Sequence, residues 1–119
     1  MIQIKRAYDP VEKSDGRRFL VDHLWPRGVK KEALQIERWV REVAPGDKLR
    51  KWFSHDPSKW KEFQRRYAAE LDKKPETWEL LLRAARGGDI TLVFSARDAE
   101  HNNAVVLKGY LEKKMTGEC

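Results

Sequence analysis

Cysteine is nearly absent from this chain of 119 residues, because Cys119 is the only one. A single thiol cannot form an intramolecular disulfide, and one chain cannot assemble a thiolate metal cluster from it. The sequence also lacks a basic and apolar leader, and it has no apolar run near the roughly 20 residues that span a bilayer. We therefore expect a cytoplasmic protein that has no membrane partner.

Several catalytic signatures are missing as well. The sequence contains no glycine-rich phosphate loop, no His-Glu-x-x-His, no Cys-x-x-Cys and no Gly-x-Ser-x-Gly. Their absence excludes ordinary nucleoside triphosphatases, zinc hydrolases, dithiol oxidoreductases and α/β-hydrolases. The 3 histidines are scattered along the chain, which does not favour a transition-metal site. We expect neither a metal nor a cofactor.

Charged and aromatic residues are plentiful instead. Apolar residues make up 40% of the chain and charged residues 37%, and there are 5 tryptophans. This aromatic content argues against disorder and predicts one domain with one core. The net charge of +6 is compatible with a nucleic-acid or anionic partner. The basic residues are mostly interleaved with glutamate, however, which is typical of solvated helical faces.

Three segments have the composition of β-strands. Residues 2–8 alternate apolar and polar side chains, residues 18–24 are almost continuously apolar, and residues 90–95 form an apolar, β-branched run. The connection at 9–17 is shorter than the dozen or so residues of a usual parallel crossover. A hairpin is therefore the simpler interpretation for the first two strands, although a cramped crossover remains open.

Apolar residues at helical spacing occupy most of the remaining chain. They predict helices over 30–43, from about Asp47, from Asp56-Pro57, from near Pro75 to Gly87, and beyond residue 103. Together the elements predict a single α/β domain over 1–119, in the order β-β-α-α-α-α-β-α. Its small three-stranded sheet, mixed or parallel, would pack with about five helices.

The second and third strands are separated by helices, so we expect them to be parallel neighbours joined by a right-handed crossover. Their carboxyl ends would then share one edge of the sheet, where open α/β proteins usually bind ligands. The sequence therefore predicts that residues 22–27 and 97–103 line a single cleft.

A dense polar cluster follows the third strand: Arg97, Asp98, His101, Asn102 and Asn103. It offers donors, acceptors and one imidazole, the mixture needed to hold an anion and move a proton. If Asp98 caps the last helix, the N-terminal backbone donors of that helix would add to an anion site. His101 and Asp98 are candidate catalytic residues, and the other three are candidate ligand-binding residues. The alternative is a structural cluster, in which Asp98 only caps, the asparagines tie the loop and His101 faces water.

Asp22 and Arg27 form the second candidate group, at the end of the second strand. A carboxylate in an apolar strand needs a partner, and Arg27 or Arg97 is the natural one. This ion pair would either orient a ligand-binding arginine or merely brace the loop. His23 alternates with Asp22, so we expect it on the opposite side of the sheet. Residues 50–56, on the crossover, could overhang the same edge.

Four blocks, in this order, resemble the motifs of the YeaO-like family of small bacterial proteins. They are Leu-Val-Asp-His-Leu-Trp-Pro-Arg-Gly, Ala-Pro-Gly-Asp-Lys-Leu-Arg-Lys-Trp-Phe, His-Asp-Pro-Ser-Lys-Trp-Lys-Glu-Phe and Ser-Ala-Arg-Asp-Ala-Glu-His-Asn-Asn-Ala-Val-Val-Leu. The resemblance covers Lys5 to Leu111 and implies kinship with a domain of unknown function. Within it, His23 stands where the family typically has arginine.

These observations favour a protein that binds a small anionic or polar ligand at the carboxyl edge of its sheet. Acid/base catalysis by His101 is a further hypothesis, and the sequence leaves open whether the protein is an enzyme. The alternative is a nucleic-acid-associated or regulatory module that uses the basic helices.

Overall fold

The computed structural model describes residues 1–117, so Cys119 lies outside the described residues. The strands are β1 (Ile2–Arg6), β2 (Arg17–Leu20), β3 (Arg38–Trp39) and β4 (Ile90–Phe94). The α-helices are α1 (Lys31–Leu34), α2 (Asp47–Phe53), α3 (Trp60–Asp72), α4 (Pro75–Gly87) and α5 (Asn103–Met115). Short 3-10 turns cover Lys13–Asp15, Arg41–Val43 and Pro57–Lys59.

The four strands form one parallel sheet in the order β1-β4-β2-β3. The expected pairing of the second strand with the 90–95 strand is confirmed: Arg17 aligns with Ile90 and Leu20 with Val93. The expected hairpin between the first two strands is wrong, because β4 lies between them and both run parallel to it. The short connection is the cramped crossover, folded around the turn at Lys13–Asp15.

The predicted helix over 30–43 is also wrong. Only Lys31–Leu34 is helical, and Gln35 then adopts a left-handed conformation with φ of 50°. The chain turns into β3, a fourth strand that pairs with β2, and continues into the turn at Arg41–Val43. Ile36, Val40 and Val43 have a spacing that fits a helix, but their burial comes from the tertiary fold.

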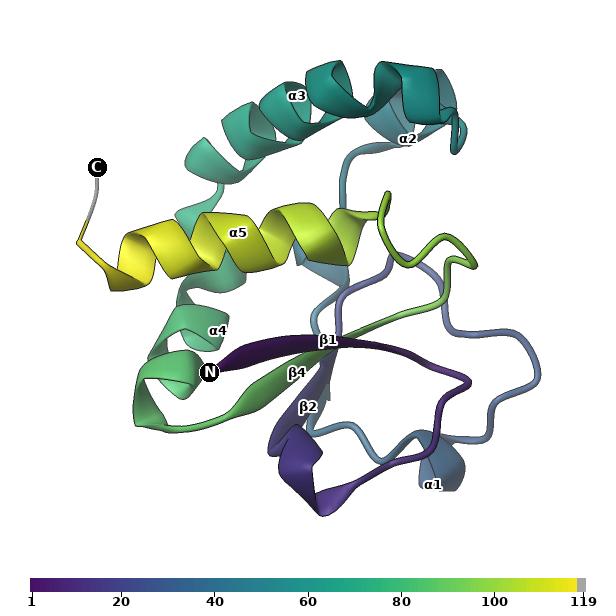
Figure 1. Ribbon diagram of the computed structural model, residues 1–119, viewed down its shortest axis with the longest axis vertical. Coiled ribbons are helices and arrows are strands. Elements are labelled where there is room, and N and C mark those ends of the chain that lie inside the picture. Colours follow the sequence, from purple (N-terminus) through teal and green to yellow (C-terminus); the bar gives the residue numbers. More distant parts are fainter. Residues whose placement is uncertain (118–119) are drawn as a thin grey trace.

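Two apolar clusters cover the two faces of the sheet. The larger contains Phe19, Leu92 and Phe94 and packs against α2, α3, α4 and α5. The smaller contains Leu20 and Val93 and packs against Leu34 of α1. Figure 1 shows α5 lying along the sheet with α3 beyond it, while α1 lies on the other side. Because the helices are concentrated on one face, the carboxyl edge stays open between the loop after β2 and the start of α5.

No helix among residues 1–117 has both the length and the apolar character that a transmembrane span requires.

Candidate functional site

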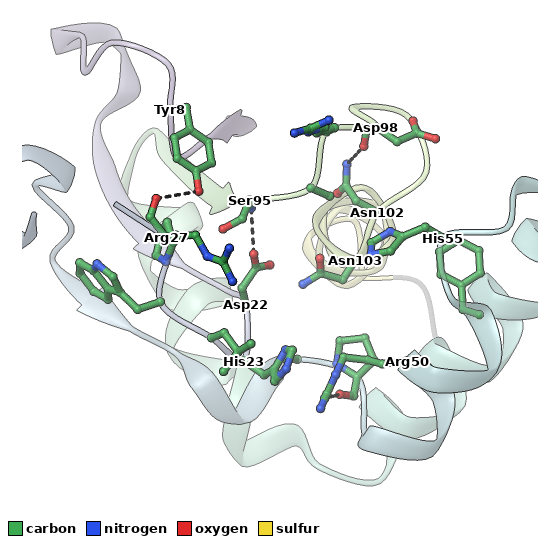
Figure 2. Close-up of a pocket in the computed structure, with 18 of the residues that line it drawn as sticks. Tyr8, Asp22, His23, Arg27, Arg50, His55, Ser95, Asp98, Asn102 and Asn103 are labelled. Carbon is green, nitrogen blue, oxygen red and sulfur yellow. Dashed lines mark hydrogen bonds between the residues drawn. The ribbon is translucent and has the colours of Figure 1, made fainter. Parts of the chain in front are cut away.

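A cleft of about 960 Å³ opens at the carboxyl edge of the sheet. The segments after β1, β2 and β4, the start of α5 and the α2 region all contribute to it (Figure 2). Its lining comprises Tyr8, Asp22, His23, Leu24, Trp25, Pro26, Arg27, Trp39, Ala44, Pro45, Arg50, Phe53, His55, Phe63, Ser95, Ala96, Arg97, Asp98, Asn102 and Asn103. The structure thus brings residues 22–27 and 97–103 together, as the parallel pairing of β2 with β4 requires.

Asp22 lies half-buried in this cleft. The Ser95 N–H donates to its Oδ2 at 2.8 Å, which fixes the carboxyl group across the ends of β2 and β4. Burial raises the pKa of Asp22, and the Ser95 N–H only partly offsets this effect. The expected ion pair with Arg27 or Arg97 is not found among residues 1–117. The carboxyl is therefore held by hydrogen bonds and not by an ion pair.

His23 lines the cleft as well, contrary to its expected place on the opposite side of the sheet. The alternation on which that expectation rested ends with β2 at Leu20, three residues earlier. Burial lowers the pKa of His23, and the nearby Arg50 lowers it further. The imidazole is thus biased towards its neutral form.

Arg27 and Arg97 are exposed and line the cleft. The backbone oxygen of Arg27 accepts a hydrogen bond from Tyr8 Oη at 3.1 Å, which ties the loop after β2 to the end of β1. Within residues 1–117, neither guanidinium has a carboxylate partner. Both charges are consequently available to an anion in the cleft.

Asp98 caps the turn before α5 and does not cap α5 itself. Its Oδ1 accepts from the N–H groups of Glu100 and His101, at 2.9 and 3.0 Å, and its Oδ2 lies 2.9 Å from His101 Nδ1. These contacts, first that with the Glu100 N–H, lower the pKa of Asp98. The carboxylate is fully engaged in ordering this loop.

His101 is not among the cleft-lining residues. Its ring packs edge-on against Trp60, with 5.1 Å between the ring centroids, while Nδ1 faces Asp98. The two candidate catalytic residues therefore contact each other, and only Asp98 borders the cleft.

Asn102 caps α5 in place of Asp98. Its Oδ1 accepts from the Val105 N–H at 3.1 Å, and its Nδ2 donates to the Asp98 backbone oxygen at 2.9 Å. Asn103 instead reaches across to the residue that follows β2, where its Nδ2 donates to the Val21 oxygen at 3.1 Å. Both asparagines line the cleft, and they place the positive end of the α5 dipole at its wall.

The rest of the wall comes partly from residues that the sequence did not single out. Arg50 and His55 overhang the edge, as residues 50–56 were expected to do. Tyr8 and Trp39 were missed. The position of Tyr8 just after β1 is a usable signal, because all parallel strands end at the same edge. Trp39 could not be placed, since its strand was interpreted as helix.

Among the described residues, no three His, Cys, Asp or Glu side chains are grouped closely enough to hold a metal ion.

The parallel sheet and its carboxyl-edge cleft define a small open α/β protein. The whole chain, residues 1–119, matches the family model described as the inactive DUF488-N3 subclade, and the protein belongs to this family. It is 42% identical over 110 residues to the uncharacterised protein YeaO of Escherichia coli K12, across 92% of this chain and 96% of that protein. The YeaO-like resemblance is thereby confirmed.

Uncharacterised mycobacterial proteins are related as well. Those of Mycobacterium bovis and of Mycobacterium tuberculosis H37Rv are each 34% identical over 106 residues, which covers 89% of this chain and 89% of each relative. No solved structure matches the chain.

Proposed function

We propose that the protein binds a small anionic ligand in the carboxyl-edge cleft and does not turn it over. The observation that carries this proposal is the pair of arginines, Arg27 and Arg97, which line one cleft without a carboxylate partner in the described part of the chain. A guanidinium is the side chain best suited to hold a carboxylate or phosphate through two parallel hydrogen bonds. The start of α5 adds a favourable dipole on the same side.

The arrangement of Asp98 and His101 supports binding rather than acid/base catalysis. A general acid or base must come within hydrogen-bond reach of the proton it transfers. His101 is turned towards Trp60, and the Asp98 carboxylate is occupied by its own loop. The description of the family as an inactive subclade agrees with a binding role.

Titration with inorganic phosphate and pyrophosphate, followed by tryptophan fluorescence, tests this function. Trp25 and Trp39 line the cleft and supply the signal. We expect saturable binding that weakens about tenfold in Arg97→Ala, which corresponds to the loss of one charge-assisted contact. Arg83→Ala removes an equal charge from the exposed face of α4 and should leave binding unchanged.

Equal weakening in both variants would reduce the effect to overall charge, and absence of binding to the wild type would overturn the proposal. Crystals grown in sulfate should show an anion between Arg27, Arg97 and the start of α5.

Nucleic-acid association by the basic helices stays a prediction. Two of the aromatic side chains that could stack on bases already carry cations of the protein: Arg41 lies 4.0 Å from the ring centroid of Trp39, and Arg66 lies 4.3 Å from that of Trp52. Retention on a polyanion that falls steeply with salt would favour it.

A further inference from the structure

The cleft is much larger than an inorganic anion requires. Its volume of about 960 Å³ lies at the upper end of the range of about 300 to 1,000 Å³ that is usual for sites of drug-sized ligands. Much of its wall is aromatic or apolar, including Trp25, Phe53 and Phe63. An occupant that uses this wall needs a flat apolar body in addition to its negative charge.

Exposed apolar side chains at the cleft support the same conclusion. Among residues 1–117, the large hydrophobic side chains that remain exposed are Met1, Tyr8 and Leu24, and the last two line the cleft. Leu24 is 65% exposed although it follows a strand of which three of the four residues are buried. Apolar groups left open beside a polar site are typical of a surface that a ligand covers.

The cleft contains a carboxyl group, that of Asp22, which the protein holds in place without a charged partner in the described part of the chain. The Ser95 N–H holds Oδ2 of Asp22 at 2.8 Å, and the Asn103 side chain also interacts with this carboxyl, which is thereby fixed as an acceptor at the cleft. The neighbouring Ser95 Oγ is buried and has no hydrogen-bond partner in the described structure. Asn103 uses its Nδ2 on Val21, so its carbonyl oxygen is also available. Figure 2 shows Asp22 and Asn103 on the two sides of one hollow.

These groups complement the edge of an amino-substituted heterocycle. A carboxylate oxygen accepts from an exocyclic amino group, as Asp and Glu do with the amino group of cytosine, and it repels a carbonyl at the same position. Arg27 and Arg97, which have no carboxylate partner in the described part of the chain, are left for the anionic end.

We infer that the ligand is a nucleoside monophosphate whose base carries an amino group, with the base directed to Asp22 and the phosphate to Arg27 and Arg97. This inference rests on the proposed function and specifies its ligand class. The sugar would then contact the apolar lining of the cleft.

The test compares cytidine and uridine 5′-monophosphates, which have nearly the same shape but present an amino group and a carbonyl at the same ring position. Inorganic phosphate is the reference ligand, and binding is measured by calorimetry on the full chain. We expect cytidine monophosphate to bind at least tenfold more tightly than phosphate and several-fold more tightly than uridine monophosphate.

Two variants, Asp22→Asn and Arg97→Ala, test the two ends of the site separately, and Asp9→Asn is the control. Asp22→Asn keeps an oxygen for the Ser95 N–H and adds an amide donor, so it should abolish or reverse the preference for cytidine monophosphate over uridine monophosphate. Asp9→Asn removes an equal charge from an exposed position outside the cleft and should keep the preference. Arg97→Ala should weaken both nucleotides and phosphate by the same factor.

The outcomes distinguish this inference from the proposed anion-binding function on which it rests. Phosphate binding that a nucleotide does not improve overturns the nucleotide inference and leaves anion binding standing. A cytidine preference that survives in Asp22→Asn overturns the assignment of the base to Asp22. Absence of binding to every ligand overturns both proposals.

Discussion

Two aspartates flank β2, one just before it and one just after it, and their hydrogen-bonding partners differ in kind. Asp15 is 2% exposed and is contacted by Lys5 Nζ at 2.8 Å and Arg18 Nη1 at 2.7 Å. Asp22 receives the Ser95 N–H and has no ion pair in the described part of the chain. Burial would raise the pKa of Asp15, but its hydrogen bonds, first that from Lys5, hold the pKa low. In Asp22, burial prevails and raises the pKa.

The contrast separates a carboxyl group that is neutralised inside the fold from one that is buried without a charged partner in the described part of the chain. A buried carboxylate with all its partners inside the protein has no capacity for a ligand. One that is buried without a charged partner lowers stability. The cleft and the cluster of Asp15, Lys5 and Arg18 both contain carboxylate and guanidinium groups. In the Asp15 cluster these groups pair with each other, whereas Asp22 does not pair with an arginine of the cleft.

The largest expected loss of stability comes from removing a charged partner of Asp15. Arg18→Met leaves Asp15 short of a buried partner and removes both donors to the Leu34 oxygen. We expect the free energy of unfolding to fall by about 3 to 5 kcal/mol, as for other broken buried pairs. Urea denaturation followed by circular dichroism measures it.

Arg17→Met is the matched control, because the neighbouring Arg17 pairs with Glu37 at the surface. Exposed ion pairs contribute little, so this variant should lose much less stability. Equal losses in the two variants would remove the distinction between the Asp15 cluster and an ordinary surface pair.

A smaller loss is expected inside the cleft itself, at Asn102. This residue is 2% exposed, caps α5 and ties the Asp98 loop, so it behaves like the Asp15 cluster although it lines the cleft. Asn102→Ala should cost about 1 to 2 kcal/mol in thermal or urea unfolding. Asn103→Ala, which loses the single bond to Val21, should cost less. The reverse order would mean that Asn103 is the structural residue of the two.

Asp22→Asn is expected to stabilise the protein, by about 1 kcal/mol or less. Because folding raises the pKa of Asp22, wild-type stability contributed by this group falls as pH rises above the ordinary value of about 3.9. The advantage of the variant should therefore grow with pH over that range. Unfolding curves of the variant and the wild type at several pH values give the difference directly.

Asp15 predicts the opposite pH dependence. Its pKa is lowered on folding, so its contribution is complete above about pH 3.9 and is lost as pH falls through the folded value. The deficit of Asp15→Asn relative to the wild type should accordingly shrink in acid. If both variants follow the same trend with pH, the two carboxyl groups do not differ as described.

The sequence predicts the long elements and the meeting of the two polar segments, because these depend on signals that side chains carry. The apolar run at 90–95, Asp56-Pro57 and the spacing of Trp60, Phe63 and Tyr67 determine elements that the structure contains. Parallel pairing of β2 with β4 then places their ends together.

Backbone conformation decides the features that were not predicted. Gln35 interrupts the expected helix by a left-handed turn that the identity of its side chain does not predict. β3 has only two residues, too few for a recognisable strand pattern, and it forms by pairing with β2 and by the contacts of Trp39 with Trp25 and with the backbone oxygen of Asp22. The end of β2 at Leu20 likewise places His23 in the cleft. Which donor reaches Asp22 also depends on register, since its partner is a backbone N–H.

The smallest effect concerns a left-handed residue at the cleft wall, His55, whose φ is 56°. A side chain in this conformation costs about 1 to 2 kcal/mol, and the greater flexibility of glycine in the unfolded chain offsets part of the gain from its removal. His55→Gly should raise the unfolding free energy by roughly 0.5 kcal/mol. Ser54→Gly, at a φ of 46° and outside the cleft lining, should gain a similar amount. If the left-handed conformation of His55 serves the ligand, only His55→Gly will weaken binding in the calorimetric titration. Equal affinity in both variants would mean that the conformations of Ser54 and His55 serve only to end α2.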